Sequence, residues 1–307
     1  MTELQRYLAE EVAEDHADGI ITRREAMHRL GLLGVRGTAA VSLLGAAAST
    51  AAAKAPKDRA DRGHGGGGGH GPRGKVQDWA PVATEAITFA GPRGQLMAAW
   101  APAAGRPRGA VLVIHENRGL TDHIRNVAGR FAASGHSALA LDLLSEEGGT
   151  AAFPGEAEVA AALSAAPPER FVADMKAAVT ELRNRSPRSA IAAIGFCFGG
   201  GMIWRLLAAG ERRLDAAAPF YGPFPEGGDL RHAKAAVLGV YGGLDARVNA
   251  TREVARAALE AARLEHRILT LTQADHAFFN DTGMRFNAPA AEEAWHRVLD
   301  WFGRHEH

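Results

Sequence analysis

The chain has 307 residues, of which 47% are hydrophobic and 23% are charged, as in ordinary globular proteins. Its 35 basic and 35 acidic residues give a formal net charge of zero, and the lack of a basic surplus argues against a nucleic-acid-binding protein. A single cysteine excludes an intramolecular disulfide and a cysteine-rich zinc site. A lone cysteine is most often a small buried apolar residue, so only its local sequence can indicate a chemical role.

Residues 1–53 differ in composition from the rest of the chain. The segment begins with a charged part that has a weak helical pattern, and a mostly apolar stretch follows over residues 30–53. Arg23 and Arg24 precede that stretch, which resembles a twin-arginine export signal and predicts a periplasmic protein. Because Arg36 interrupts the stretch and the preceding part is long and acidic, an uncleaved arm on a cytoplasmic protein is the alternative. The stretch is too broken to predict a stable membrane span.

Residues 54–82 are rich in glycine, proline and charge, and they include the run Gly65–Gly69 between His64 and His70. A segment of this composition cannot bury apolar surface, so it predicts a disordered linker. Two histidines beside a glycine run could bind a metal weakly, but a solvated linker is the favoured interpretation. We therefore expect no metal site here, and a catalytic domain that spans residues 83–307.

Strand and helix patterns alternate from residue 84 onward. The continuous apolar run at residues 110–114 is typical of a strand that is covered on both faces. Strands are predicted at residues 86–90, 96–101, 110–114, 137–143, 190–195, 216–221, 236–241 and 267–272, and helices at 122–134, 168–185, 199–209, 250–263 and 290–302. This alternation predicts an α/β fold with a mostly parallel sheet, doubly wound by right-handed crossovers. We expect one catalytic domain with an N-terminal extension.

The single cysteine, Cys197, lies in the segment Gly195-Phe196-Cys197-Phe198-Gly199 between a predicted strand and a predicted helix. The chain must turn sharply there, and the two glycines remove side chains that would clash in such a turn. The pattern is the nucleophile elbow of the α/β-hydrolase fold, with cysteine in place of serine. The amides at the start of the following helix would stabilise a thiolate. We therefore predict that Cys197 is a nucleophile.

A thiol nucleophile needs a general base, and the base needs a carboxylate that orients it. In α/β-hydrolases the acid follows a later strand than the nucleophile and the histidine follows the last strand. Asp245 and His276 stand at these two places, whereas His232 and His266 precede their strands and are expected at the surface. Asp275 is the competing acid, but a sequence neighbour of the histidine rarely has the geometry to orient its ring. Asp245 is therefore the favoured partner.

The oxyanion hole of such an enzyme uses the amide after the nucleophile and one from the loop after an earlier strand. These criteria select the amide of Phe198 and, within the loop at residues 115–120, the amide of Asn117. Gly119 stands where a zinc-protease HExxH motif would need its second histidine, so that class is excluded. No strand is followed by a Walker loop or a GxGxxG motif, and nucleotide binding has no support.

At these residues the chain resembles the dienelactone hydrolase family of α/β-hydrolases, over about residues 84–305. The matching segments are His115-Glu116-Asn117-Arg118-Gly119-Leu120, Leu141-Asp142-Leu143, Gly195-Phe196-Cys197-Phe198-Gly199-Gly200, Tyr241-Gly242-Gly243-Leu244-Asp245 and Asp275-His276-Ala277-Phe278. The resemblance implies a triad of Cys197, His276 and Asp245, with no metal or organic cofactor. It also implies that Glu116 interacts with the resting thiol, the alternative being a solvated loop carboxylate.

The sequence departs from the family's type enzyme at two places. There, arginines that bind the substrate carboxylate lie shortly after the Asp-Leu strand end and four residues after the catalytic histidine, where this chain has Glu146 and Asn280. Loss of a bidentate arginine removes the strongest anchor for a carboxylate, so a neutral ester or lactone is expected. Arg118 either supplies positive charge near the site or lies on the surface. Aromatic residues near strand ends either line an apolar pocket or belong to the core; they are Phe198, Tyr221, Phe278 and Phe279.

The sequence therefore predicts a carboxylic ester hydrolase that cleaves a small-molecule ester or lactone through an acyl-thioester intermediate, as a monomer or dimer. An acyltransferase or thioesterase that uses the same site is one alternative. A non-catalytic binding protein is the other, and it is disfavoured because no member of the predicted triad is missing.

Overall fold

The computed structural model describes residues 1–54 and 80–306, with the side chains of 50–54 left aside. The chain divides into two compact units, Met1–Lys75 with Ala160–Ala165 and Val76–Val159 with Ala166–His307. Each unit is described by itself. The linker predicted at residues 54–82 falls almost entirely outside the described residues.

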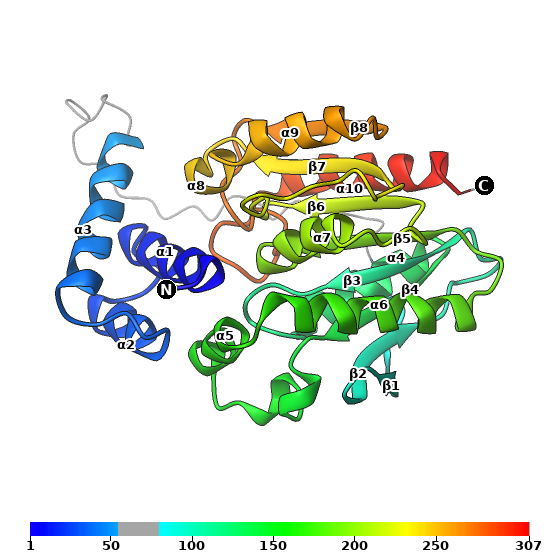
Figure 1. Cartoon of the computed structure of the whole chain (residues 1–307), viewed down its shortest axis with the longest axis horizontal. Coiled ribbons are helices and arrows are strands. Elements are labelled where there is room, and N and C mark those ends of the chain that lie inside the picture. Colours follow the sequence, from blue (N-terminus) through cyan, green and yellow to red (C-terminus); the bar gives the residue numbers. More distant parts are fainter. Residues whose placement is uncertain (55–79, 307) are drawn as a thin grey trace, which may run out of the picture. The chain divides into compact units, whose positions relative to one another are not determined.

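The N-terminal region forms three helices, α1 (Glu3–Ala17), α2 (Arg23–Leu32) and α3 (Gly37–Lys54) (Figure 1). A capping box starts α1, because the Gln5 amide donates to Thr2 Oγ1 (3.1 Å) and the Thr2 amide donates to Gln5 Oε1 (2.9 Å). Both arginines of the predicted export signal lie exposed in the first turn of α2. None of the helices in the described part of the chain is long and apolar enough to cross a membrane.

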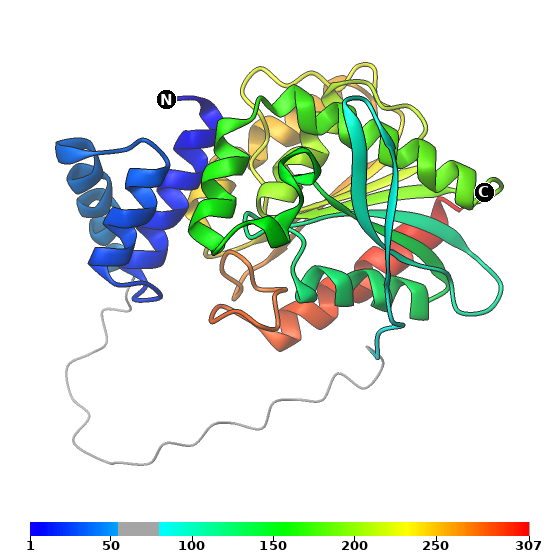
Figure 2. The same ribbon diagram turned by 90° about the horizontal axis from the view of Figure 1, so that it is seen from below.

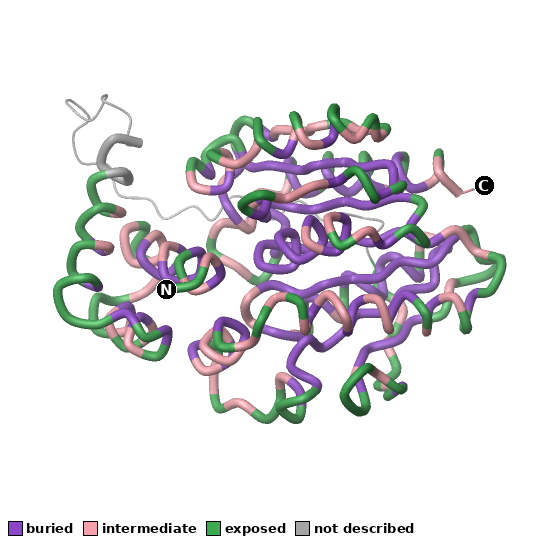
Figure 3. The backbone as a smooth tube through the Cα atoms, viewed as in Figure 1, coloured by how far each residue is buried: buried purple, intermediate pink, exposed green. Residues whose placement is uncertain are grey.

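The second unit contains an eight-stranded sheet of order β1-β2-β4-β3-β5-β6-β7-β8 (Figure 1). The strands are β1 (Glu85–Gly91), β2 (Gly94–Ala101), β3 (Gly109–Ile114), β4 (His136–Asp142), β5 (Ile191–Phe196), β6 (Ala216–Phe220), β7 (Ala236–Gly242) and β8 (His266–Leu271). The pairs β1–β2 and β2–β4 are antiparallel and all the others are parallel. Every predicted strand is present, with its ends within two residues of the expected positions. The central strands are buried along their whole length, as Figure 3 shows.

Helices cover both faces of this sheet, as the view in Figure 2 shows. They are α4 (Asp122–Ala133) and α10 (Ala288–Arg304) on one face, and α6 (Pro168–Arg185) and α7 (Phe198–Ala208) on the other. Right-handed crossovers explain the division. The chain moves one way along the sheet from β3 to β4 and the opposite way from β4 to β5 and from β5 to β6, so the connecting helices lie on opposite faces. The doubly wound sheet predicted from the sequence is confirmed.

The connections contain short elements that the sequence did not predict. Residues 144–167 were expected to be a loop, but they include α5 (Glu156–Ala165) and two single 3-10 turns. The helix expected over 250–263 is present as α9 (Arg252–Ala261), and the short helix α8 (Ala246–Asn249) precedes it. The two 3-10 turns begin shortly after β4 and α8 begins shortly after β7, at the carboxyl ends of these strands.

The neighbouring strands β3 and β5 form the topological switch point of the sheet. The crossovers that follow them run in opposite directions, and in open α/β sheets ligands bind at the carboxyl ends of the strands at such a point. The predicted oxyanion loop follows β3, and Cys197 follows β5. The fold thus brings these two segments to one place.

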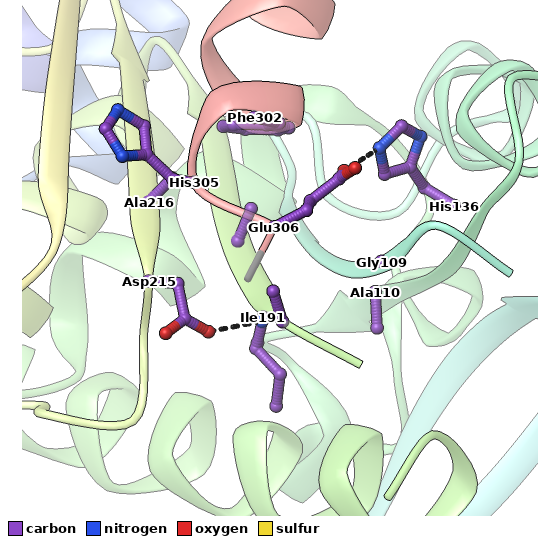
Figure 4. Close-up of a pocket in the computed structure, with 11 residues that line it drawn as sticks. Gly109, Ala110, His136, Ile191, Asp215, Ala216, Phe302, His305 and Glu306 are labelled. Carbon is purple, nitrogen blue, oxygen red and sulfur yellow. Dashed lines mark hydrogen bonds and ion pairs between the residues drawn. The ribbon is translucent and has the colours of Figure 1, made fainter. Parts of the chain in front are cut away.

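The opposite edge of the sheet, at the amino ends of β3 and β5, is closed by the end of the chain (Figure 4). There Glu306 Oε1 contacts His136 Nε2, and the Ile191 amide donates to Asp215 Oδ2 at 2.8 Å. A side chain at Gly109 would lie 3.0 Å from Glu306 Oε1. These contacts fasten the C-terminus of α10 over the strands, and they lie at the edge opposite to Cys197.

Candidate active site

Cys197 occupies a tight turn between β5 and α7. Its φ of 55° and ψ of −118° are disfavoured for a residue with a side chain, and its amide donates to the Phe220 carbonyl (3.0 Å). A Cβ atom on Gly195 would lie 2.2 Å from the Gly199 carbonyl oxygen, and one on Gly199 would lie 2.5 Å from the His115 carbonyl oxygen. Only glycine fits at these two positions, as the sequence pattern predicted.

Two further glycines allow α7 to begin close to the sheet. A Cβ atom on Gly200 would lie 2.3 Å from the Phe220 carbonyl oxygen, and one on Gly222 would lie 2.2 Å from the Gly201 amide nitrogen. The first turn of α7 is therefore in backbone contact with the ends of β3 and β6. This places the positive end of the helix dipole beside the Cys197 side chain.

His276 and Asp245 form a buried pair in the loops after β8 and β7. The distance from His276 Nδ1 to Asp245 Oδ2 is 2.6 Å, and each residue is 2% exposed. Asp245 is held in turn by the Val248 amide, which donates to its Oδ1 at 3.0 Å. Asp275, the competing acid, accepts the backbone amide of His276 (2.7 Å) and so fixes the loop. Of the two candidate acids, the structure places Asp245 against the ring.

The Cys197 side chain lies beside His276, with its Sγ within 4.8 Å of a nitrogen of the ring. Burial alone would lower the pKa of His276, but the charges of Asp245 and Cys197 outweigh it and raise this pKa well above its ordinary value. Burial would also raise the pKa of Asp245, but the charge and hydrogen bond of His276 hold it below its usual range. These interactions favour the protonated form of the imidazole. A protonated histidine beside a cysteine favours the thiolate.

The loop after β3 is held against the start of α7 by His115. This fully buried ring donates from Nδ1 to the Glu116 carbonyl (2.6 Å) and accepts the Leu143 amide at Nε2 (3.1 Å). Burial lowers the pKa of His115, and a neutral ring fits this pattern. The ring also stacks on Phe198, with 6.3 Å between centroids. Among the described residues, the amides of Phe198 and Asn117 have no hydrogen-bond partner.

A second set of contacts fastens the same loop to the segment after β4. The Leu120 amide donates to Thr150 Oγ1 at 2.8 Å, while Asp142 accepts both the amide (2.7 Å) and the hydroxyl (3.0 Å) of Thr150. Gly119 has a φ of 78°, and a Cβ atom there would lie 2.3 Å from Thr150 Oγ1. The loop after β3 is thus held both by the start of α7 and by the segment after β4.

Glu116 is buried in this loop, and its Oε2 accepts a hydrogen bond from Asn280 Nδ2 at 2.6 Å. No hydrogen bond joins Glu116 to Cys197 among the described residues, so the interaction with the thiol implied by the family resemblance stays a prediction. The sequence did not predict the contact with Asn280, which stands out in the sequence only as the position of a missing arginine. The two residues are 164 positions apart, and no local pattern signals their contact.

The predicted pocket residues have different surroundings. Arg118 forms an ion pair with Glu156 (3.3 Å) at the start of α5. Tyr221 is buried beside the catalytic candidates, with its ring centroid 5.3 Å from that of His276 and 5.3 Å from that of Phe278. The aromatic side chains near the strand ends are all fully buried; they are Phe198, Tyr221, Phe278 and Phe279. Tyr221 is the one of these whose ring contacts the His276 ring.

Glu146 and Glu147 belong to a cluster of charges that the sequence did not reveal. Arg93, in the turn between β1 and β2, contacts Glu146 and lies 3.0 Å from Asp174 Oδ1. Arg170 contacts Glu147 and lies 3.6 Å from Glu146 Oε2. The cluster therefore pairs its arginines with carboxylates of the same unit.

The sheet, the elbow and the residues after its strands define an α/β-hydrolase. The profile of the dienelactone hydrolase family matches residues 97–306, and the chain belongs to this family. It is 34% identical over 209 residues to an Escherichia coli O157:H7 protein named "Putative carboxymethylenebutenolidase", with 64% of this chain and 77% of that protein covered.

Solved structures agree with this assignment. One is that of a protein described as a "Putative Dienelactone Hydrolase" from Klebsiella pneumoniae subsp. pneumoniae MGH 78578, with a TM-score of 0.62, 28% identity, and 72% of this chain and 99% of that chain covered. Another is a dienelactone hydrolase-like promiscuous phosphotriesterase from metagenomic libraries, with a TM-score of 0.62, 25% identity, and coverages of 73% and 98%. The comparisons confirm the predicted fold and identify the protein as a carboxylic ester hydrolase.

The charge cluster generates a prediction on stability. The side chain of Asp174 is 1% exposed, and its burial raises its pKa to about 6, although Arg93 opposes the shift. A carboxyl pKa that is higher in the folded state adds stability at low pH, and this contribution is lost as the pH rises through about 6. Between pH 7.5 and pH 5, the wild type should gain about 1 kcal/mol of unfolding free energy relative to Asp174→Asn. Urea unfolding at both pH values measures the difference.

Glu169→Gln, which removes another acid from the same helix, is the matched control. The difference in unfolding free energy between wild type and Glu169→Gln should be the same at both pH values. A difference between wild type and Asp174→Asn that is the same at both pH values would contradict the assignment.

Proposed function

We propose that the protein hydrolyses uncharged esters or lactones through a triad of Cys197, His276 and Asp245, with an acyl-thioester intermediate. The observation that carries this proposal is the buried series of contacts from Cys197 to His276 and from His276 Nδ1 to Asp245 Oδ2 (2.6 Å). The raised pKa of His276 supports a resting thiolate–imidazolium pair, which is the reactive form of a cysteine nucleophile.

In the acylation step the Cys197 thiolate attacks the carbonyl carbon, and the carbonyl electrons move to the oxygen. The amides of Phe198 and Asn117 would donate to this oxyanion, because they lie on adjacent segments and lack other partners among the described residues. The oxyanion then collapses and the carbon–oxygen bond to the leaving group breaks. His276 gives its proton to the departing alkoxide. With a lactone, the resulting hydroxyl remains attached to the acyl group.

In the second step neutral His276 takes a proton from water, and the hydroxide attacks the thioester. Collapse of the second oxyanion releases the acid and restores the thiolate beside a protonated imidazole. Asp245 keeps Nδ1 protonated and stabilises the positive ring in both steps. Acyl transfer to an alcohol or thiol would share the first step, and product analysis with added acceptors separates it from hydrolysis.

The charges of the surrounding loops favour an uncharged substrate. Arg118 is paired with Glu156, and Arg93 and Arg170 are paired with the carboxylates after β4. Glu116 is a buried carboxylate that receives a neutral amide donor from Asn280. A carboxylate on the substrate would find these cations already paired, and it would be repelled by the buried Glu116 carboxylate.

The triad gives a prediction on activity. Cys197→Ala and His276→Ala should each lose about 10³-fold or more in kcat/KM with p-nitrophenyl acetate, because the nucleophile or its base is removed. Asp245→Asn should lose about 10²- to 10⁴-fold. It should also shift the alkaline limb of the pH–rate profile to lower pH, because the carboxylate charge that raises the pKa of His276 is gone.

His266→Ala is the matched control, since this histidine begins β8 and is half-buried away from the triad. It should retain wild-type activity. Full activity in Cys197→Ala would refute the proposed mechanism.

A further prediction concerns the charge of the substrate. For ester pairs of the same chain length with and without a terminal carboxylate, such as the p-nitrophenyl ester of butyrate and the hemi-ester of succinate, kcat/KM should favour the neutral ester by about 10-fold or more. A preference of that size corresponds to about 1.4 kcal/mol. Equal or better turnover of the anionic ester would show that a cation of the site is free to bind it.

We also propose that residues 1–53 direct export, because Arg23 and Arg24 are exposed and precede an apolar stretch. N-terminal sequencing of the protein from its native host should then find a chain that begins after this stretch, in the periplasmic fraction. Replacement of both arginines by lysine should abolish processing, whereas Arg36→Lys should not. An intact N-terminus in the cytoplasmic fraction would instead support the uncleaved arm.

A further inference from the structure

Asn280 lies in the loop after His276, and its side chain is held at both ends. Its Oδ1 accepts the Thr282 amide (3.0 Å) and the Thr282 hydroxyl (2.7 Å). Its Nδ2 donates to Glu116 Oε2 at 2.6 Å. This orientation of the amide matches donors with acceptors, because the flipped group would turn its NH₂ toward the Thr282 amide, which can only donate, and its oxygen toward a carboxylate.

The loop that carries Asn280 is anchored independently of the amide. Asp281 Oδ1 lies 2.9 Å from His123 Nδ1, and Asp281 Oδ2 contacts Arg130. Both partners are buried in α4, the helix that follows the oxyanion loop. Burial would raise the pKa of Asp281, but the hydrogen bond of His123 and the charge of Arg130 lower it to about 2. Asn280 is thus presented to Glu116 from a fixed support.

Glu116 directly precedes Asn117, whose amide is the proposed second donor to the oxyanion. The carbonyl of Glu116 accepts from His115 Nδ1 (2.6 Å), and its side chain accepts from Asn280. With the carbonyl and the carboxylate both held, the peptide unit that carries the Asn117 amide has a defined direction. An oxyanion donor is effective only when it is aimed before the charge develops.

We propose that Asn280 is a positioning residue, which acts through the Glu116 side chain to aim the oxyanion amide of Asn117. This inference rests on the proposed function, because it needs an oxyanion at the site. In this proposal the hydrogen bond from Asn280 to Glu116 joins the loop that carries His276 to the loop that carries Asn117. The neutral donor holds the carboxylate without adding a positive charge to the site.

A double-mutant cycle tests the connection. Asn280→Ala should lower kcat for p-nitrophenyl acetate by about 10- to 100-fold with little change in KM, since a misaimed donor weakens transition-state binding. Glu116→Ala should lower kcat by at least as much. The double variant should be no slower than Glu116→Ala, because Asn280 has nothing left to act on. Multiplied losses in the double variant would overturn the proposal, as they would show that Asn280 acts by another route.

Asn280→Asp supplies a second readout that a purely structural role would not move. The substitution keeps the acceptor for Thr282 but places a carboxylate against Glu116, and two carboxylates at that distance must share one proton. The activity of this variant relative to wild type should therefore rise as the pH falls from 8 to 5. The other ionisable groups around this loop are unchanged in the variant; they are Asp275, Asp281, His123, Arg130, His276 and Cys197.

Asn287→Asp is the matched control, since it places the same new charge in the same loop, where Asn287 caps α10 and contacts Gln273 instead of Glu116. Its activity ratio should not depend on pH. A flat ratio for Asn280→Asp would overturn the proposal. Cys197→Ala, assayed alongside, separates the two inferences. If Cys197→Ala stays active, the triad mechanism fails. If Cys197→Ala is inactive but the losses in the double variant multiply, or the Asn280→Asp ratio does not depend on pH, only the role of Asn280 is refuted. Circular dichroism melts of all variants verify that they are folded.

Discussion

The close approach of α7 to the sheet is the constraint on which the site depends. Three segments meet at the first turn of this helix: the end of β3, the end of β6 and the turn that carries Cys197. Their backbones approach so closely that a Cβ atom at Gly195, Gly199 or Gly200 would clash with backbone atoms of the neighbouring segment. The contact gives Cys197 its unusual backbone conformation and at the same time sets the oxyanion loop beside the helix amides. The proposed nucleophile and the proposed oxyanion donors are therefore fixed by one packing arrangement.

Buried charges are the second requirement of the site, and they stabilise one another. An isolated buried ion is costly, and the cost is offset only when partners and hydrogen bonds are well placed. His276 lies between Asp245 and Cys197, and its raised pKa expresses the favourable sum of these interactions over the opposing effect of burial. Asp245 obtains a further donor from the backbone of α8. The short helix α8, which the sequence did not predict, thus has a direct role in holding the acid.

Much of the fold follows from patterns that are local in the sequence. Buried strands such as β3 and β5 are continuous apolar runs, and the elbow glycines mark a turn that tolerates no side chain. The order of strands and helices then places Asp245 and His276 at the correct edge of the sheet. The short elements after β4 and β7 were not predicted, because α5, α8 and the single 3-10 turns are set by contacts with distant segments instead of by a hydrophobic period of their own.

The part of the site that the sequence could not show consists of polar contacts between loops. Asn280 and Glu116 are 164 positions apart, and Arg93 and Asp174 are 81 apart, so no spacing rule brings either pair together. The family resemblance drew attention to Asn280 as a missing arginine, whereas the structure gives the residue a contact of its own. A charged donor at that position would leave the buried Glu116 neutralised and add a rigid ion pair. An amide keeps the same hydrogen bond with no added charge, so it holds the loops together in a way that fits the uncharged substrate proposed for the site.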